Sequence, residues 1–198
     1  MKKLIDITVL SARKARDFVS ETPWAAIQIS THPGDFPTLN QCQLRATLQL
    51  SFPDLDVPSD IPIIGPEGTV YESIGGEDLF GPEHALEICR FVDTQLRSGV
   101  NKFLIHCQAG YSRSPAIAAA LEKILNGASN MHTVMVCPDN CAPSAPYARF
   151  WVKSSYTEFD GTGNNSQYFD TEKYNPNMRV YETLLKIGLD YHWFSSIY

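Results

Sequence analysis

The hydrophobic and polar positions of this chain alternate between strand-like and helix-like patterns. Apolar runs rich in β-branched residues predict four strands, at residues 4–10, 24–30, 46–52 and 103–105. Apolar positions at helical spacing, together with cap and stop residues, predict helices that begin at Ala12 and that span 85–96, 116–126 and 177–187. Because strands alternate with helices, we expect an α/β fold in which a central, mainly parallel β-sheet is flanked by helices.

Two segments do not fit this alternation. Residues 53–82 are dense in proline, glycine and acidic residues and are longer than an ordinary connection, so they are predicted to form a long, acid-bearing functional loop. Residues 129–174 contain turn residues and aromatics without a clear period, and we interpret them as an insertion that decorates the core. With both segments included, residues 1–198 are predicted to form one domain.

Composition narrows the class of protein. The chain has 198 residues, of which 43% are hydrophobic and 19% charged, a balance typical of a folded domain. Its net charge of −6 lacks the basic excess of a nucleic-acid binder, and no apolar run reaches the roughly 18 residues of a membrane span. Lys2 and Lys3 resemble the start of a signal peptide, but Asp6 interrupts the apolar run. We therefore predict a cytoplasmic protein with neither nucleic-acid nor membrane partners, and leave its oligomeric state open.

The five cysteines are an odd number without a secretory signal, which indicates reduced thiols. Cys137 and Cys141 lie near His132, but their spacing and the missing fourth ligand argue against a metal site, so we predict neither a metal nor a cofactor. Cys42 and Cys89 remain open as resolving partners for an oxidised thiolate elsewhere in the chain, although packing is the simpler role for Cys89.

The sequence HCQAGYSRSP, residues 106–115, joins the predicted strand at 103–105 to the helix that follows. In a strand–loop–helix connection, backbone N–H groups converge on an anion at the helix N-terminus. Five residues separate Cys107 from Arg113, so a curled loop brings both side chains to one centre. Gly110 permits the positive φ that such a curl needs, and Pro115 suits a first helical turn. The motif thus predicts an anion-binding loop.

Each polar side chain of this motif has a chemical role. A helix N-terminus and a neighbouring cation favour the ionised form of a thiol, so Cys107 is predicted to be a thiolate nucleophile. The planar fork of Arg113 can bind two phosphate oxygens at once. Ser114 can donate a hydrogen bond to the sulfur and make it a better leaving group in a second step.

The pattern H-C-x5-R-S resembles the signature of the cysteine-dependent protein tyrosine phosphatases, and HCQAGYSRSP is similar to their dual-specificity branch. The resemblance implies a phosphatase P-loop with a phosphocysteine intermediate on Cys107, an imidazole of His106 that orients the loop, and hydrolysis by water. It also implies that the phosphate is bound by the loop residues Gln108, Ala109, Gly110, Tyr111, Ser112 and Arg113.

Weaker similarity extends beyond the loop to the small bacterial and phage tyrosine-phosphatase-like proteins. Their "L-x-F-x-D" and "P-N-x-x-V" segments resemble Leu50–Asp54 and Pro176–Val180 of this chain. The stretch after Asp54 is longer here than in that family, and residues 129–174 have no counterpart in it.

Expulsion of an alkoxide or phenolate requires a general acid. The resemblance implies an aspartate on a mobile loop, and Asp54 is our prediction because it follows the predicted strand at 46–52. Asp56 would face the same way in an extended stretch, and Asp78 lies beside glycines that suit a moving lid, so both stay open as alternatives.

The predicted function is a phosphate-monoester hydrolase: a protein tyrosine phosphatase, with dual specificity left open, whose partner is a phosphorylated protein substrate. Phosphoinositide-directed relatives carry lysines in the loop, whereas Gln108, Ala109 and Tyr111 are uncharged. A non-catalytic phosphoprotein-binding module that uses the same loop is the alternative, but such a module would be expected to lack Cys107 or Arg113. A sulfurtransferase would share the loop but would not need the acid or Ser114.

Overall fold

The computed structural model describes residues 4–65, 68–126 and 174–193. Its elements are, in chain order, β1 (Asp6–Ser11), α1 (Ala12–Ala15), β2 (Trp24–Ser30), β3 (Leu44–Ser51), β4 (Ser59–Gly65), β5 (Gly68–Ile74), α2 (Pro82–Arg97), β6 (Lys102–Cys107), α3 (Arg113–Asn126) and α4 (Met178–Asp190).

Four of the strands form a parallel sheet in the order β1-β6-β2-β3. The predicted α/β fold with a mainly parallel sheet is therefore confirmed. Every residue of β2 is buried, as expected for a central strand that is covered on both faces. Because all four strands run in the same direction, the residues that follow β3 and β6 come together at one edge of the sheet.

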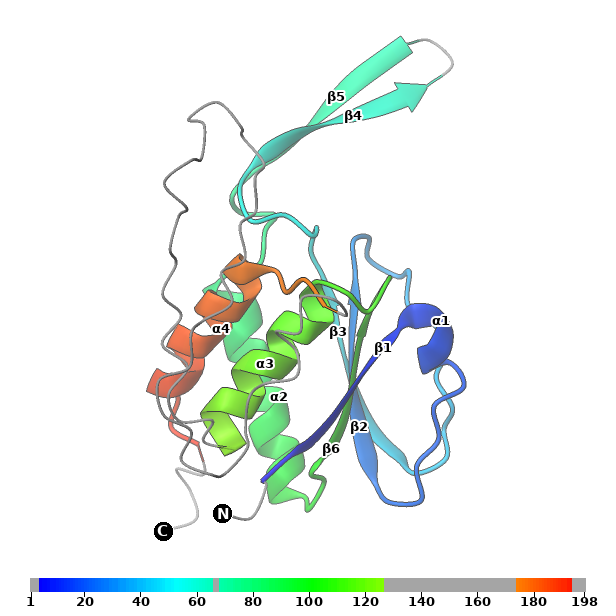
Figure 1. Ribbon diagram of the computed structural model, residues 1–198, viewed down its shortest axis with the longest axis vertical. Helices are drawn as coiled ribbons and strands as arrows, with labels where there is room; N and C mark the ends of the chain where they lie inside the picture. Colours follow the sequence, from blue (N-terminus) through cyan, green and yellow to red (C-terminus); the bar gives the residue numbers. More distant parts are fainter. Residues whose placement is uncertain (1–3, 66–67, 127–173, 194–198) are drawn as a thin grey trace.

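Helices cover the sheet unequally. Figure 1 shows α2, α3 and α4 on one face, while α1 lies on the other. The strand residues alternate accordingly: Ala25 and Ile27 of β2 belong to the large core under the three helices, and Trp24 and Ala26 pack in a smaller cluster on the opposite face. The central strands thus read as continuous apolar runs.

The helix beginnings explain the differences from the predicted boundaries. Ser11 caps α1 by accepting a hydrogen bond from the Lys14 N–H, but this helix is a single turn. The predicted helix at 116–126 begins three residues earlier, because the carbonyl of Ser112 accepts from the Ala116 N–H. The last three residues of the HCQAGYSRSP motif, Arg113–Pro115, therefore lie in the first turn of α3.

The prediction of a loop over the whole of residues 53–82 was wrong. Within it, β4 and β5 form an antiparallel hairpin of their own, and Figure 1 shows the hairpin projecting from the body of the molecule. Proline and glycine obscured the strand pattern, but a two-stranded hairpin accommodates Pro62 because each strand keeps an unpaired edge. We call residues 57–79, the hairpin with its two connections, the arm.

Two further predictions concern residues beyond the described ranges. The proposed insertion at 129–174 lies almost wholly outside them, as do His132, Cys137 and Cys141. Among the described residues, no three His, Cys, Asp or Glu side chains gather as a metal site would require. No helix in the described part of the chain has both the length and the apolar character needed to cross a membrane.

Candidate active site

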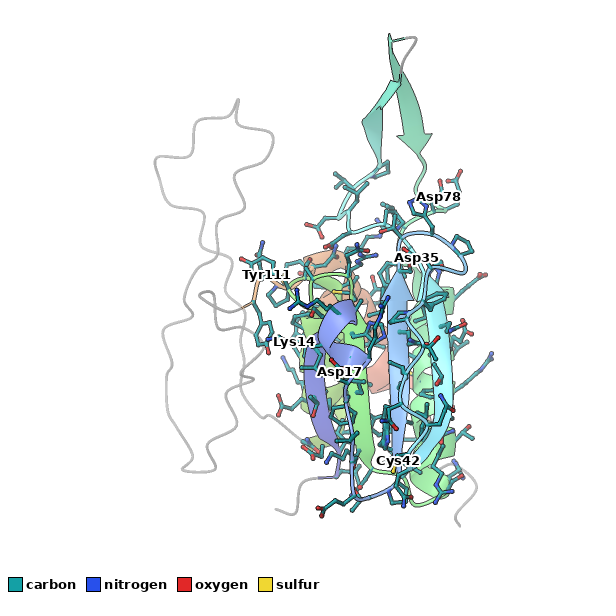
Figure 2. The ribbon with its side chains drawn as sticks, turned by 90° about the vertical axis from the view of Figure 1, so that its right-hand side faces the viewer. Lys14, Asp17, Asp35, Cys42, Asp78 and Tyr111 are labelled. Carbon is teal, nitrogen blue, oxygen red and sulfur yellow. The ribbon has the colours of Figure 1, made fainter. Side chains whose placement is uncertain are left out.

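The loop between β6 and α3 lies at the edge of the sheet where the parallel strands end. We call residues 107–113 the Cys107 loop. Its backbone is held from both sides: the Gln108 carbonyl accepts from the Ala12 N–H at 3.2 Å, and the Tyr111 carbonyl accepts from the Asn175 N–H at 2.9 Å. Figure 2 shows Tyr111 toward the end of the body from which the arm projects. Segments far apart in the sequence therefore fix the loop.

Gly110 is required by this geometry for two reasons. Its φ is +70°, in the left-handed region that the motif predicts for the curl. A Cβ atom at this position would also lie 2.6 Å from the backbone of Leu10 and Ser11. The end of β1 thus packs directly against the bare Cα of the loop.

The nucleophile candidate and the first turn of α3 are in direct contact. The Ser114 hydroxyl donates a hydrogen bond of 3.2 Å to the sulfur of Cys107, so the predicted contact is confirmed. Cys107 is 2% exposed and Ser114 is fully buried. A thiolate at this position would be stabilised by that hydrogen bond and by the amino end of α3.

Arg113 is buried, with 4% of its surface exposed, and one nitrogen of its guanidinium, Nη1, donates hydrogen bonds to the protein. Nη1 donates to the Phe52 carbonyl at 2.7 Å and to the Thr31 hydroxyl at 3.2 Å, and the Phe52 ring centroid lies 5.9 Å from the guanidinium carbon. Nε has no hydrogen-bond partner among the described residues and faces Asp54 Oδ2 at 3.9 Å. This N–H group can bind an anionic oxygen.

Asp54 is the acid candidate whose carboxylate the structure places against the Cys107 loop. Its Oδ1 accepts from the Ser112 hydroxyl at 2.8 Å and from the Asn177 side-chain amide at 3.0 Å. Its Oδ2 lies on the side of Arg113, and the side chain is 36% exposed. The carboxylate is thus both oriented by neighbours and open to solvent.

The other two candidate acids lie in different settings. Asp78 is exposed, and its Oδ2 accepts from the Gly75 N–H at 2.9 Å, which closes a local turn at the end of the arm (Figure 2). The backbone carbonyl of Asp56 accepts from Arg179 Nη1 at 3.4 Å, just before the arm begins. These contacts give Asp78 and the Asp56 backbone structural roles.

His106 lies beneath the loop as a neutral imidazole. Gln28 Nε2 donates to the Pro37 carbonyl at 2.8 Å and lies 3.1 Å from His106 Nε2, while Gln28 Oε1 accepts from Gln49. Since the Gln28 nitrogen is a donor, His106 Nε2 must accept, which places the ring proton on Nδ1. Burial lowers the pKa of His106 to about 4, so the ring is uncharged at neutral pH.

The rim of the loop carries no charge. Gln108, Ala109 and Tyr111 are exposed, whereas Gly110 and Ser112 are buried. The exposed positions are therefore available to a bound molecule, and the two buried ones shape the loop.

Two other cysteines, Cys42 and Cys89, lie within the described residues. Figure 2 shows Cys42 at the opposite end of the body from Tyr111. Cys89 is buried on α2 beside Gly188 of α4, and burial raises its pKa to about 12. Cys42 is therefore not placed to act as a resolving thiol, whereas Cys89 has the packing role that was the simpler of its two predicted roles.

Sequence reasoning missed three residues of this site. Asn177 was assigned to a helix start, and its side chain does cap α4 by accepting from the Val180 N–H at 3.0 Å, but it also binds Asp54. Gln28, which contacts His106, and Thr31, which contacts Arg113, lie at the end of β2 or just after it. The only sequence feature that could have identified Gln28 and Thr31 as site residues is that each is a polar residue near the carboxyl end of a buried parallel strand.

No protein-family model and no curated protein matches this sequence. Among solved structures, the chain is similar to the crystal structure of a human tyrosine phosphatase-like serine/threonine/tyrosine-interacting protein. The two are 17% identical with a TM-score of 0.42, and the match covers 83% of this chain and 75% of that one.

Proposed function

We propose that the protein hydrolyses phosphate monoesters through a phosphocysteine intermediate on Cys107. The observation that carries the proposal is the arrangement of the Cys107 loop, in which the buried sulfur of Cys107 accepts a hydrogen bond from Ser114 and the buried Arg113 keeps its Nε free of hydrogen-bond partners among the described residues. The thiol of Cys107 and the guanidinium of Arg113 thus meet at the amino end of α3, which supports their proposed roles as nucleophile and phosphate-binding cation.

In the first step, the Cys107 thiolate attacks phosphorus, an S–P bond forms, and the P–O bond to the leaving group breaks. The leaving oxygen takes a proton from Asp54, whose Oδ2 lies beside Arg113. The equatorial oxygens of the transferring group are bound by Arg113 and by backbone N–H groups of the loop, which stabilise their charge.

In the second step, a water molecule attacks phosphorus and the S–P bond breaks, which returns the electron pair to sulfur. The Asp54 carboxylate accepts the proton that the water loses. The hydrogen bond from Ser114 stabilises the departing thiolate, so its largest effect is expected on this step. His106 takes no proton in either step, because its neutral ring is buried beneath the loop.

The substrate class that fits this site is a phosphorylated protein side chain, phosphotyrosine first. The exposed rim residues Gln108, Ala109 and Tyr111 offer no cations that would select a polyphosphorylated headgroup. Tyr111, 44% exposed, offers an aromatic face for an aryl phosphate. Dual specificity would require the same site to reach the shorter phosphoserine and phosphothreonine.

The test uses the full chain and 4-nitrophenyl phosphate in a chelating buffer. Wild type is expected to release phosphate, and Cys107→Ser to abolish release while it keeps the wild-type circular dichroism spectrum. Cys42→Ser is the matched control, since this thiol lies at the far end of the body. Turnover that survives Cys107→Ser contradicts the mechanism. Binding of phosphate or vanadate by wild type without turnover would instead identify a non-catalytic phosphoprotein-binding module.

A further inference from the structure

The two ends of the arm are held together by one side chain from α4. Arg179 Nε donates to the carbonyl of Phe80 at 2.8 Å, and Nη1 donates to the carbonyl of Asp56 at 3.4 Å. These carbonyls belong to the residues that flank the arm, residues 57–79. The guanidinium therefore links the two ends of the arm, which we describe as closing its base. This link needs two donors at a fixed angle, Nε and Nη1, which a guanidinium provides.

One of these two ends is anchored independently. Phe80 is fully buried, and its ring centroid lies 5.0 Å from that of Phe52 and 5.5 Å from that of His84. Arg179 thus ties the Asp56 carbonyl to a fixed point in the core. Since Asp56 is two residues from Asp54, this bond sets the path of the chain beside the candidate acid.

The same turn of α4 also contacts Asp54 and the Cys107 loop. Asn177 donates from its side chain to Asp54 and from its backbone to the Ser112 carbonyl at 3.2 Å. Its side-chain oxygen caps the helix, which fixes the amide that Asp54 accepts from. Arg179 and Asn177 therefore act on one stretch of chain, Asp54–Asp56, from one rigid element.

We propose that Arg179 is a positioning residue for the candidate acid: by closing the base of the arm it holds Asp54 at the distance from Arg113 at which a proton reaches the leaving oxygen. The inference rests on the proposed function and adds to it the element that sets the acid. The arm is a hairpin whose two strands pair with each other in a sheet separate from the main one. Without the guanidinium, movement of this projecting element would displace the Asp56 carbonyl and with it Asp54.

A misplaced acid leaves a specific kinetic signature. A leaving group that is stable as an anion departs without a proton, whereas phenolate requires one. Loss of Arg179 should therefore slow phenyl phosphate far more than 2,4-dinitrophenyl phosphate, because both substrates use Cys107 and Arg113 alike. General damage to the loop would slow both substrates equally.

The experiment compares wild type, Arg179→Gln, Arg179→Lys and Lys186→Gln. Lys186 is exposed on the same helix, so its replacement controls for the lost charge. We expect both Arg179 variants to lose about 10- to 100-fold in kcat/KM on phenyl phosphate, since kcat/KM reports the first step and small misplacements of reacting groups have effects of this size. On 2,4-dinitrophenyl phosphate we expect kcat/KM close to that of wild type, because its leaving group needs no proton in the first step, and Lys186→Gln should be unchanged on both substrates.

Amide hydrogen exchange gives a second readout that does not depend on turnover. In Arg179→Gln, the N–H groups at residues 54–57 should exchange faster than in wild type, and those in β6 should not. Equal loss of kcat/KM on both substrates, or no loss with unchanged exchange, would overturn the positioning role while wild-type turnover leaves the proposed function intact. Absence of turnover in wild type would overturn the proposed function, and the positioning role with it.

Discussion

The hydroxyl of Ser112 donates a hydrogen bond of 2.8 Å to Oδ1 of Asp54, across 58 residues of sequence. Ser112 belongs to the Cys107 loop, which follows β6, and Asp54 lies just after the end of β3, which β2 separates from β6 in the sheet. The bond therefore joins the residue proposed to donate a proton to the loop proposed to bind phosphate. Asn177 donates to the same oxygen, so Oδ2 is the oxygen left to face Arg113.

Asp54→Asn is expected to lower kcat on phenyl phosphate by about 10²- to 10⁴-fold, the usual contribution of a general acid. The amide oxygen can still accept from Ser112 and Asn177, so the fold should be unaffected. Asp78→Asn is the control, and an equal loss in that variant would contradict the assignment of the acid.

Ser114→Ala should slow hydrolysis of the phosphocysteine more than its formation. Hydrogen bonds to charged groups contribute about 1.5–3 kcal/mol, which corresponds to roughly 10- to 100-fold in rate if the bond is made to the departing thiolate. Rapid-quench measurements with 4-nitrophenyl phosphate should then show a burst of nitrophenol followed by a slow steady rate. A uniform slowing without a burst would argue against this role for Ser114.

Gly110→Ala should destabilise the protein by about 3 kcal/mol or more, since it combines a positive φ with a clash against the backbone of β1. Gly34→Ala is a matched control, because Gly34 has a φ of +84° but no atom within 4 Å of an added Cβ. The control should lose about 1 kcal/mol. Urea unfolding curves of both variants measure the difference, and equal losses would show that the contact with Leu10 and Ser11 can relax.

The buried imidazole of His106 should make the protein less stable in acid. Burial lowers its pKa to about 4 in the folded protein, from the ordinary value of 6.5 that the unfolded chain keeps, so the unfolded chain binds this proton more tightly. The contribution of His106 to the free energy of unfolding is fully present above pH 6.5. It decreases as the pH falls toward 4, by about 3 kcal/mol in total. Unfolding curves at about pH 7 and about pH 4.5 test this. His106→Gln should reduce the difference, while His192→Gln, an exposed control, should retain it.

Local sequence patterns predicted the parts of the molecule that local physics determines. The strand–loop–helix order around Cys107, the positive φ of Gly110 and the contact of Ser114 with the sulfur all follow from residues within one short motif. The contact between Asn177 and Asp54 joins residues 123 positions apart, and no local pattern encodes such a pairing.

The hairpin escaped prediction for a different reason. Its strands pair only with each other, in a sheet separate from the main one, and Pro62 and the glycines at both ends of the hairpin turn obscure the alternation of apolar and polar residues that predicts a strand. Likewise, the role of Gln28 depends on the side-by-side pairing of β2 and β6, which places it next to His106. Strand order is a property of the whole sheet and is absent from any short window of sequence.

The bond between Arg113 and the carbonyl of Phe52 has a thermodynamic consequence. One guanidinium is shared between the end of β3 and any anion bound at Nε, so the energies of anion binding and of the β3 terminus are linked. Linkage is reciprocal. An oxyanion that holds the guanidinium in place should stabilise the backbone at Phe52–Asp54, and a change that destabilises this backbone should lower the affinity for the oxyanion by the same factor. Anion binding at Arg113 should therefore change the stability of the segment that carries Asp54, the proposed acid.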